Sequence, residues 1–399
     1  MKILQLTKKF PYPVKDGEAI AIYTLASSLQ QLGAEVTLLC MNTPKHFFDI
    51  QELPDSFNHY KNIHAVEVDT SVKSAAAFAN LFSNKSYHIS RFDNDAYRKK
   101  LIVLLETGDF DIVQLETLFL APYLETIRNY SKAKIVMRAH NVEHEIWERI
   151  TSNTSFLPKR YYLQLLTSRL ATYEKGHLNK YDLLLPITKR DLEKKESLGF
   201  RQRALVTPIG LNATDYQLNE ASYQKPLSIS FIGSLDWMPN VEGLQWFLEK
   251  VWPVATKNHP DLVLHLAGRN TPDDLYKLEN EQLKIHGEIP DAKAFINDHS
   301  LMLVPLLSGS GMRVKILEGM ALGKVVLTTT IGLEGIDAIH KENVLIADNP
   351  KEFLEALEYC HSNKEKLQSI GKAARQLIVE KYDNLSIAKR VLDAYTLSL

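Results

Sequence analysis

Short β-rich runs alternate with longer stretches of helical periodicity along almost the whole chain, and this alternation constrains the fold more than any other feature. A first series of strand candidates covers residues 2–7, 35–41, 63–68, 111–115, 134–139 and 182–186, with helical stretches such as 19–32 and 161–178 between them. A second series covers 227–232, 262–266, 283–286, 301–305, 325–328 and 344–346. Strands separated by helices predict parallel βαβ sheets with right-handed crossovers. The predicted fold class is α/β, with two Rossmann-like domains.

A polar segment rich in turn-forming residues separates the two series. It covers 207–226 and contains Pro208, Gly210, Asn212 and Asn219. We predict an N-terminal Rossmann-like domain over 1–206, a linker over 207–226, a C-terminal Rossmann-like domain over 227–380, and a C-terminal helix over 381–399 that could pack back on the first domain. The 399 residues suffice for two such cores. Two parallel sheets that face each other across a cleft would form a natural two-substrate site.

Composition excludes several classes of function. Hydrophobic content of 45% and charged content of 24% are ordinary for a globular protein, and the formal net charge of −1 gives no sign of nucleic-acid binding. The two cysteines, Cys40 and Cys360, form no metal-binding spacing. The N-terminus lacks the long apolar region of a signal peptide, and no window reaches the roughly 20 apolar residues that span a bilayer. We therefore expect a cytoplasmic protein.

The first domain could also contact the inner face of a membrane. The basic and aromatic residues that could make this domain membrane-seeking are Lys8, Lys9, Lys73, Lys85, Phe47, Phe48, Phe78 and Phe82. Ordinary surface and core positions explain the same residues.

The most informative motif is SGSGMRVKILEGMALG at 308–323, which follows a predicted strand and opens a helix. Glycines at 309 and 311, with Ser310 between them, let a ligand approach the backbone, and a helix N-terminus attracts phosphate. Arg313 and Lys315 could offer two cations to a diphosphate, and Glu318 could hold ribose hydroxyls. The alternative is a glycine-rich turn followed by a Lys315–Glu318 surface pair. The apolar positions of this helix favour the ligand interpretation, because its charged end is expected to be buried.

His140 closes the predicted strand 134–139, at the edge where catalytic residues usually lie. It could instead cap a helix or bond to its neighbours. His140 and His144 are four apart, but the run is HNVEH rather than HExxH, so we do not expect a metal site here. The run Asp93-Asn94-Asp95 has the DxD form of metal-dependent glycosyltransferases, yet it precedes a helical stretch, so helix capping explains it better.

Gly17 also stands between a loop and a helical stretch, so its backbone could approach a diphosphate, or it could be a simple turn glycine. The neighbouring Asp16, or a histidine near this loop, could act as a general base.

Several segments, in order, resemble glycosyltransferase family 4, which has the GT-B fold. They are KDGE at 15–18, RAHNVEH at 138–144, TPIGL at 207–211, FIGSLDWMPN at 231–240, the run at 308–323 and GLEG at 332–335. The resemblance covers most of the chain. It implies a first domain that binds the acceptor, a second that binds a nucleotide-sugar donor, and retaining transfer. No metal or other cofactor is expected, because the only DxD run is explained as a helix cap and Arg313 with Lys315 could neutralise a diphosphate. By resemblance, His140 would contact the donor sugar or the leaving group.

Two departures from the family pattern concern the donor site. The family carries two glutamates eight residues apart, and here Glu318 matches the second while Ser310 stands at the first. The family also often has an Arg and a Lys after the first strand of its second domain, near Gly233, where this chain has Ser234 and Asn240. We infer that Arg313 and Lys315 supply the positive charge instead.

The predicted function is transfer of a sugar from a nucleotide-diphosphate sugar to a glycan or lipid-linked glycan, in surface polysaccharide synthesis. UDP is expected ahead of GDP. Two alternatives remain. A nucleotide-sugar 2-epimerase of the same fold would bind the donor without needing an acceptor. A non-catalytic nucleotide-sugar-binding protein would fit the loss of the family glutamate at Ser310, although Arg313, Lys315 and Glu318 weigh against it.

Overall fold

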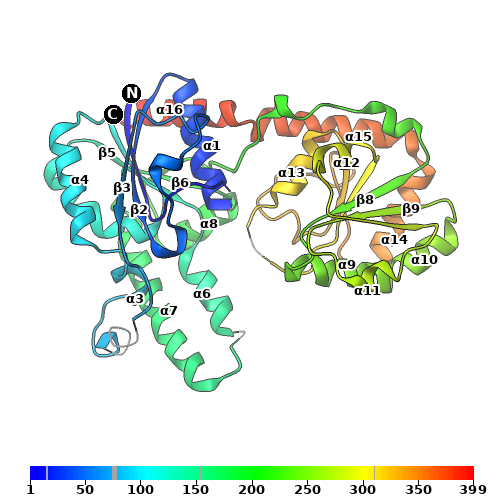
Figure 1. The fold of residues 1–399 in the computed structure, drawn as a ribbon, viewed down its shortest axis with the longest axis horizontal. Helices are drawn as coiled ribbons and strands as arrows, with labels where there is room; N and C mark the ends of the chain where they lie inside the picture. The colour runs from blue at the N-terminus through cyan, green and yellow to red at the C-terminus, as the bar shows by residue number, and fades with distance from the viewer. Residues whose placement is uncertain (15–16, 74–78, 153, 310) are drawn as a thin grey trace. The chain divides into compact units, whose positions relative to one another are not determined.

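The computed structural model describes residues 1–14, 17–73, 79–152, 154–309 and 311–399. The chain divides into two compact units (Figure 1). Unit 1 contains Met1–Gly210 and Asn384–Leu399, and unit 2 contains Leu211–Asp383. Among the described residues, every helix falls short of the length and apolar character needed to cross a bilayer.

Unit 1 is built on a seven-stranded sheet with the order β3-β2-β1-β4-β5-β6-β7. Every neighbouring pair in this order is parallel. The strands are β1 (Lys2–Thr7), β2 (Glu35–Asn42), β3 (Asn62–Glu67), β4 (Ile112–Leu115), β5 (Lys134–Ala139), β6 (Leu183–Pro186) and β7 (Arg203–Ala204). The helices are α1 (Gly17–Gln31), α3 (Tyr87–Ser90), α4 (Asp95–Thr107), α5 (Leu124–Tyr130), α6 (Glu143–Ser152), α7 (Leu157–His177), α8 (Lys189–Ser197) and α16 (Asn384–Thr396).

Unit 2 contains a six-stranded sheet with the order β10-β9-β8-β11-β12-β13, again parallel throughout. Its strands are β8 (Ser228–Ile232), β9 (Val263–Ala267), β10 (Leu283–Gly287), β11 (Leu301–Val304), β12 (Val325–Thr328) and β13 (Leu345–Ile346). Its helices are α9 (Met238–Lys250), α10 (Trp252–Asn258), α11 (Asp273–Tyr276), α12 (Ala292–Asn297), α13 (Val314–Ala321), α14 (Pro350–Ser362) and α15 (Lys364–Leu377). The prediction of two parallel α/β sheets is confirmed. The short edge strand β7 was not predicted.

The last helix, α16, belongs to unit 1 although the whole of unit 2 precedes it in the chain. It lies against α1 (Figure 1). Its apolar stripe is buried in the same core as strands β1, β2 and β6, and consists of Ile387, Ala388, Val391 and Tyr395. The spacing of these residues by one, three and four positions gives α16 one apolar face. Burial of that face means that the core of unit 1 requires the end of the chain.

Candidate functional site

Each sheet reverses its strand order beside its first strand. The reversal falls between β1 and β4 in unit 1 and between β8 and β11 in unit 2. Ligands of open parallel sheets bind outside the carboxyl ends of the strands at such a point. The polar residues that follow β4 and β5 in unit 1, and β8 and β11 in unit 2, are therefore the candidates for a functional site.

In unit 2, the loop from β11 to α13 adopts a backbone that only glycine tolerates well. Gly309 has φ 106° and Gly311 has φ 83°. Ser310 lies outside the described residues. A Cβ atom at Gly309 would lie 2.8 Å from Nη2 of Arg313, so glycine also makes room for this guanidinium. Arg313 is buried, and its guanidinium carbon lies 5.7 Å from the centre of the Trp237 ring. Burial lowers the pKa of Arg313, and the carboxylate of Glu334 opposes this.

Lys315, in the first turn of α13, connects this loop to the segment after β8. Its ammonium donates to Oδ1 of Asn240 at 2.7 Å and to the carbonyl of Ile232 at 3.4 Å. Burial, with a further contribution from Arg313, lowers the pKa of Lys315 to about 7. Both described acceptors are neutral oxygens, so the ammonium has lost water without gaining a carboxylate. This arrangement leaves its charge available to an anion.

Asn240 connects this ammonium to two other predicted site residues, Gly233 and Ser234. Asn240 is buried, and its Nδ2 donates to the carbonyl of Ser234 at 2.9 Å. A Cβ atom at Gly233 would lie 2.5 Å from Nδ2 of Asn240, so the close approach requires glycine. The structure therefore brings Gly233, Ser234 and Asn240 close to Lys315. The sequence predicts one donor site for these four residues.

Glu318 and Lys315 each have a partner other than one another. Oε1 of Glu318 accepts a hydrogen bond from the hydroxyl of Tyr216 at 3.1 Å, and burial raises the pKa of this carboxyl. The interpretation of the two residues as an exposed ion pair thus has no support in the described contacts. Glu334, which was not predicted as a site residue, accepts a hydrogen bond from the backbone N–H of Gly311 at 3.2 Å. The GLEG run gave the signal that could have identified it.

In unit 1, His140 follows β5 and lies on a fully buried carboxylate. Its Nε2 is 2.9 Å from Oε2 of Glu116, which follows β4. The same oxygen lies 3.6 Å from Nη1 of the buried Arg138. Burial alone would raise the pKa of Glu116, but Arg138 and His140 outweigh it, so the pKa is lowered. Glu116 was not predicted, although a charged residue directly after a buried strand is unusual enough to have drawn attention.

A second layer of polar side chains holds this carboxylate. Oε1 of Glu116 accepts from the amide of Gln5 at 2.5 Å and from the amide of Gln114. The hydroxyl of Tyr60 donates to Gln5 at 2.8 Å, and that of Tyr395, on α16, donates to Gln114. The polar cluster is therefore built from β1, β4, β5 and the final helix.

The ionised Glu116 determines which nitrogen of His140 carries a proton. An ionised carboxylate can only accept hydrogen bonds, so Nε2 must be the donor. A neutral imidazole then presents Nδ1 as an acceptor, and no described side chain occupies it. Nδ1 of His140 can accordingly accept a hydrogen bond from a ligand.

His144 belongs to a separate cluster. Its Nδ1 lies 2.8 Å from Oε2 of Glu174, whose other oxygen accepts from Lys195 at 2.7 Å. Burial opposes ionisation of Glu174, but His144 and Lys195 lower its pKa to about 2. Burial raises the pKa of the neighbouring Glu143 to about 7. The two histidines of HNVEH thus contact different carboxylates.

Two other predicted motifs have simple structural roles. The side chain of Asn94 accepts from the backbone N–H of Tyr97 at 3.0 Å and caps α4, so the capping interpretation of Asp93-Asn94-Asp95 is confirmed. Gly17 is the first residue of α1 and is exposed, and a Cβ atom there would contact nothing within 4 Å. Asp16 lies outside the described residues.

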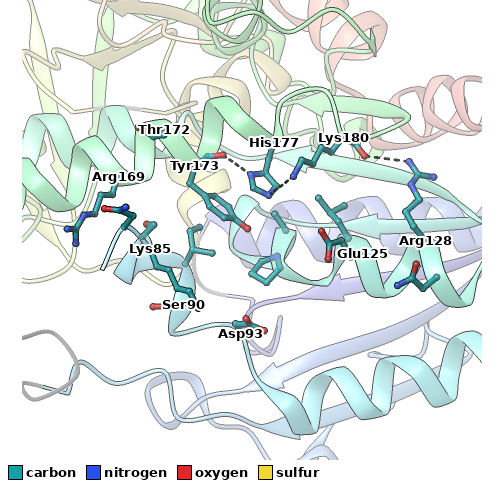
Figure 2. A pocket seen from close by; sticks show the side chains of 17 residues that line it. Lys85, Ser90, Asp93, Glu125, Arg128, Arg169, Thr172, Tyr173, His177 and Lys180 are labelled. Carbon is teal, nitrogen blue, oxygen red and sulfur yellow. Dashed lines mark hydrogen bonds between the residues drawn. The ribbon is translucent and has the colours of Figure 1, made fainter. Parts of the chain in front are cut away.

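A cavity of about 860 Å³ lies elsewhere in unit 1, among α3, α5 and α7 (Figure 2). Figure 2 shows His177 beside Tyr173, with its Nδ1 2.8 Å from the Tyr173 carbonyl and its Nε2 3.4 Å from Nζ of Lys180. Charges of both signs line the cavity, including Lys85, Asp93 and Glu125. None of the predicted site residues does so. This cavity, although large, is therefore separate from the predicted site.

Solved proteins with the same architecture define the class. Sucrose-phosphate synthase from Thermosynechococcus elongatus superimposes with a TM-score of 0.68 at 14% identity, over 100% of this chain and 99% of that one. HepE from Anabaena, solved in complex with UDP, also gives 0.68 at 14% identity, over 100% of both chains. The two parallel α/β units and the full-length superposition on these proteins show that the fold is GT-B.

Sequence comparison finds similarity to glycosyltransferases in the second unit. Residues 226–363, which lie in unit 2, match the family model described as glycosyl transferases group 1. A protein from Klebsiella pneumoniae, described as an uncharacterized 44.6 kDa protein in the cps region, is 24% identical over 408 residues, or 97% of each chain. Assignment to family 4 in particular stays a prediction.

Proposed function

We propose that the chain transfers a sugar from UDP-sugar to a glycan or lipid-linked glycan, with retention of configuration, in surface polysaccharide synthesis. The observation that carries this proposal is the half-buried Lys315 ammonium, which has neutral partners and belongs to the first turn of the helix that follows the two positive-φ glycines. A diphosphate leaving group gains negative charge in the transition state, and a preorganised cation in such a place stabilises it. The UDP and UDP-glucose complexes of HepE and the cps-region relative support the choice of donor and pathway class.

The proposed roles of the other residues follow from their positions. Arg313 and the backbone of Gly309 and Gly311 would contact the diphosphate, and Glu318 would hold the ribose. His140, oriented by Glu116, would contact the donor sugar through Nδ1. With Arg313 and Lys315 both placed toward the diphosphate, the reaction would need no divalent metal. The enzyme would act in the cytoplasm, at the inner face of the membrane where lipid-linked acceptors are assembled.

Lys315→Met tests the assignment. We expect turnover with UDP-sugar to fall on the order of 10²-fold, as for the loss of one electrostatic contact in an active site. The matched control is Lys324→Met, which removes another cation of unit 2. Lys324 is fully buried and donates to the Asn219 carbonyl at 3.0 Å and the Ser222 hydroxyl at 2.9 Å.

Both variants should be compared by melting temperature, UDP affinity and transfer rate. Because no anion can reach Lys324, its variant should lose stability but keep nucleotide affinity when folded. Wild-type affinity and rate in a folded Lys315→Met variant would exclude this donor site.

A further inference from the structure

The cavity among α3, α5 and α7 of unit 1 is lined by two stacked aromatic rings (Figure 2). Tyr173 and His177 are four residues apart on α7 and so share one face of the helix. Their ring centroids lie 3.9 Å apart, with an interplanar angle of 22°. The Tyr173 carbonyl can only accept, so Nδ1 of His177 carries the proton of the bond between them, and Nε2 accepts from Lys180. Burial lowers the pKa of His177, in keeping with a neutral ring.

Hydrogen bonds within the protein fix the loop that lies beside these rings. Arg169, one turn before Tyr173 on α7, donates to the carbonyl of Asn80 at 2.8 Å and to its side-chain oxygen at 3.0 Å. The side chain of Asn80 donates in turn to the carbonyl of Lys85 at 3.0 Å. These bonds hold Asn84 and Lys85, which line the cavity, against α7. The shape of the cavity is therefore determined by the fold rather than by a ligand.

Several polar groups of the lining retain capacity for further hydrogen bonds. The hydroxyl of Tyr173 has no hydrogen-bond partner in the part of the chain that the structure describes. Burial, together with the carboxylates of Asp93 and Glu125, raises the pKa of Tyr173. Figure 2 shows this hydroxyl directed toward the part of the cavity where these carboxylates lie. Other lining side chains without a hydrogen bond or ion pair to a described residue are those of Asn84, Lys85, Glu125 and Asn129.

The lining also has an excess of positive charge that the protein does not balance. Arg128 pairs with Asp182, which lies outside the lining, at 2.9 Å, and Asp93 pairs with Arg98. The charges of the lining that have no such ion pair among the described residues are those of Lys85, Arg169, Lys180 and Glu125. Cations outnumber carboxylates in this set, so a ligand that carries negative charge is favoured.

We propose that this cavity, which we call the α7 cavity, binds a segment of an acidic oligosaccharide, with a sugar ring on Tyr173 and sugar carboxylates near the unpaired cations. The C–H groups on one face of a pyranose ring pack against the negative face of an aromatic ring, and its hydroxyls need both donors and acceptors around them. The volume of about 860 Å³ is near the top of the range of about 300–1,000 Å³ for ligand pockets, so more than one sugar ring can enter.

Other classes of ligand fit the α7 cavity less well. A nucleotide could stack on Tyr173, but the carboxylates of Asp93 and Glu125 would repel its phosphates. A purely apolar ligand would leave the polar groups of the lining without hydrogen bonds. The α7 cavity shares no residue with the proposed donor site. Binding of a glycan here does not depend on the proposed transfer and can be measured without it.

The test measures the affinity of the full chain for trisaccharides by isothermal titration. The probes are trisaccharides of galacturonic acid and of glucuronic acid, each with its neutral counterpart of galactose or glucose in the same linkage. We expect the acidic trisaccharides to bind more tightly than the neutral ones. Tyr173→Phe keeps the ring and should weaken binding about fivefold through loss of the hydroxyl. Tyr173→Ala also removes the ring and should weaken binding roughly thirtyfold. Lys85→Ala should weaken binding of the acidic trisaccharides alone, about twofold to fivefold.

Matched controls come from exposed positions of α7 outside the cavity. Tyr161→Ala and Lys175→Ala should bind every trisaccharide like the wild type. All variants should keep their affinity for UDP, so failure of this proposal is distinguishable from failure of the proposed donor site in unit 2. The proposal is overturned if no trisaccharide binds, if acidic and neutral trisaccharides bind equally, or if the Tyr173 and Lys85 variants bind like the controls. Loss of UDP affinity in a folded Tyr173→Phe variant would assign the cavity to a nucleotide instead.

Discussion

Nucleotide-sugar affinity should depend on pH through Lys315. In the free protein the pKa of this ammonium is about 7, because burial opposes its charge. A bound diphosphate would favour the charged form and return the pKa toward the ordinary value of about 10.4. The protonated form therefore binds, and affinity should fall as pH rises above 7. For these two values, linkage gives roughly tenfold weaker binding at pH 8 than at pH 6.

Isothermal titration with UDP-glucose suits this measurement, because a diphosphate esterified at both ends keeps a constant charge over that range. Titrations in buffers of different ionisation enthalpy should show net proton uptake on binding, which grows toward pH 8. Lys315→Met should bind more weakly and lose both the uptake and the pH dependence, whereas Lys324→Met should retain them. Affinity that stays constant from pH 6 to pH 8, or the same pH dependence in Lys315→Met, would refute the assignment of this lysine to the diphosphate.

Three other perturbations separate the site from its support. Glu116→Gln should cost about 3–5 kcal/mol of stability, since it leaves the buried Arg138 without its carboxylate. Because the pKa of Glu116 is lowered in the folded state, its contribution is present above the unfolded value of about 4.3 and lost at lower pH, so the difference in melting temperature between variant and wild type should shrink in acid. Glu318→Ala should weaken UDP binding and Glu318→Gln should do so less, because one acceptor oxygen survives; equal affinities would remove Glu318 from the ribose. Transfer should persist in EDTA, and loss of activity that magnesium or manganese restores would contradict the proposed metal independence.

The sheets could be predicted from sequence because each strand is a local pattern. The run 325–328 and the run 134–139 agree with β12 and β5 residue for residue, since each has a core of consecutive apolar residues typical of a strand buried on both faces. Strand β7 has only two residues and no such pattern. Its pairing with β6 becomes apparent only when the sheet is assembled.

The candidate site was predictable where glycine or charge follows a strand, and less so where a residue depends on distant partners. Gly309, Gly311 and Lys315 belong to one motif. The role of Glu116 depends on Gln5, 111 residues away, and the Gln114 that supports it depends on Tyr395, 281 residues away. The periodicity of a short sequence segment cannot predict contacts between residues so far apart in the chain. They arise from the strand order and from the return of α16 to unit 1.

The buried cations of this chain show which charges serve the fold and which remain for a ligand. Arg138 lies beside Glu116 and Lys195 beside Glu174, and in each case a buried carboxylate balances the charge within the protein. Lys315 and Lys324 donate only to neutral oxygens among their described partners, so both have lowered pKa values. Access distinguishes these two, because Lys324 is completely buried whereas Lys315 is only partly buried, in the helix that follows the glycine loop. A cation that has lost its hydration and has no carboxylate partner is stabilised more by a bound anion than a paired cation is. The protein thus keeps an unbalanced positive charge at the position where the proposed reaction releases a diphosphate.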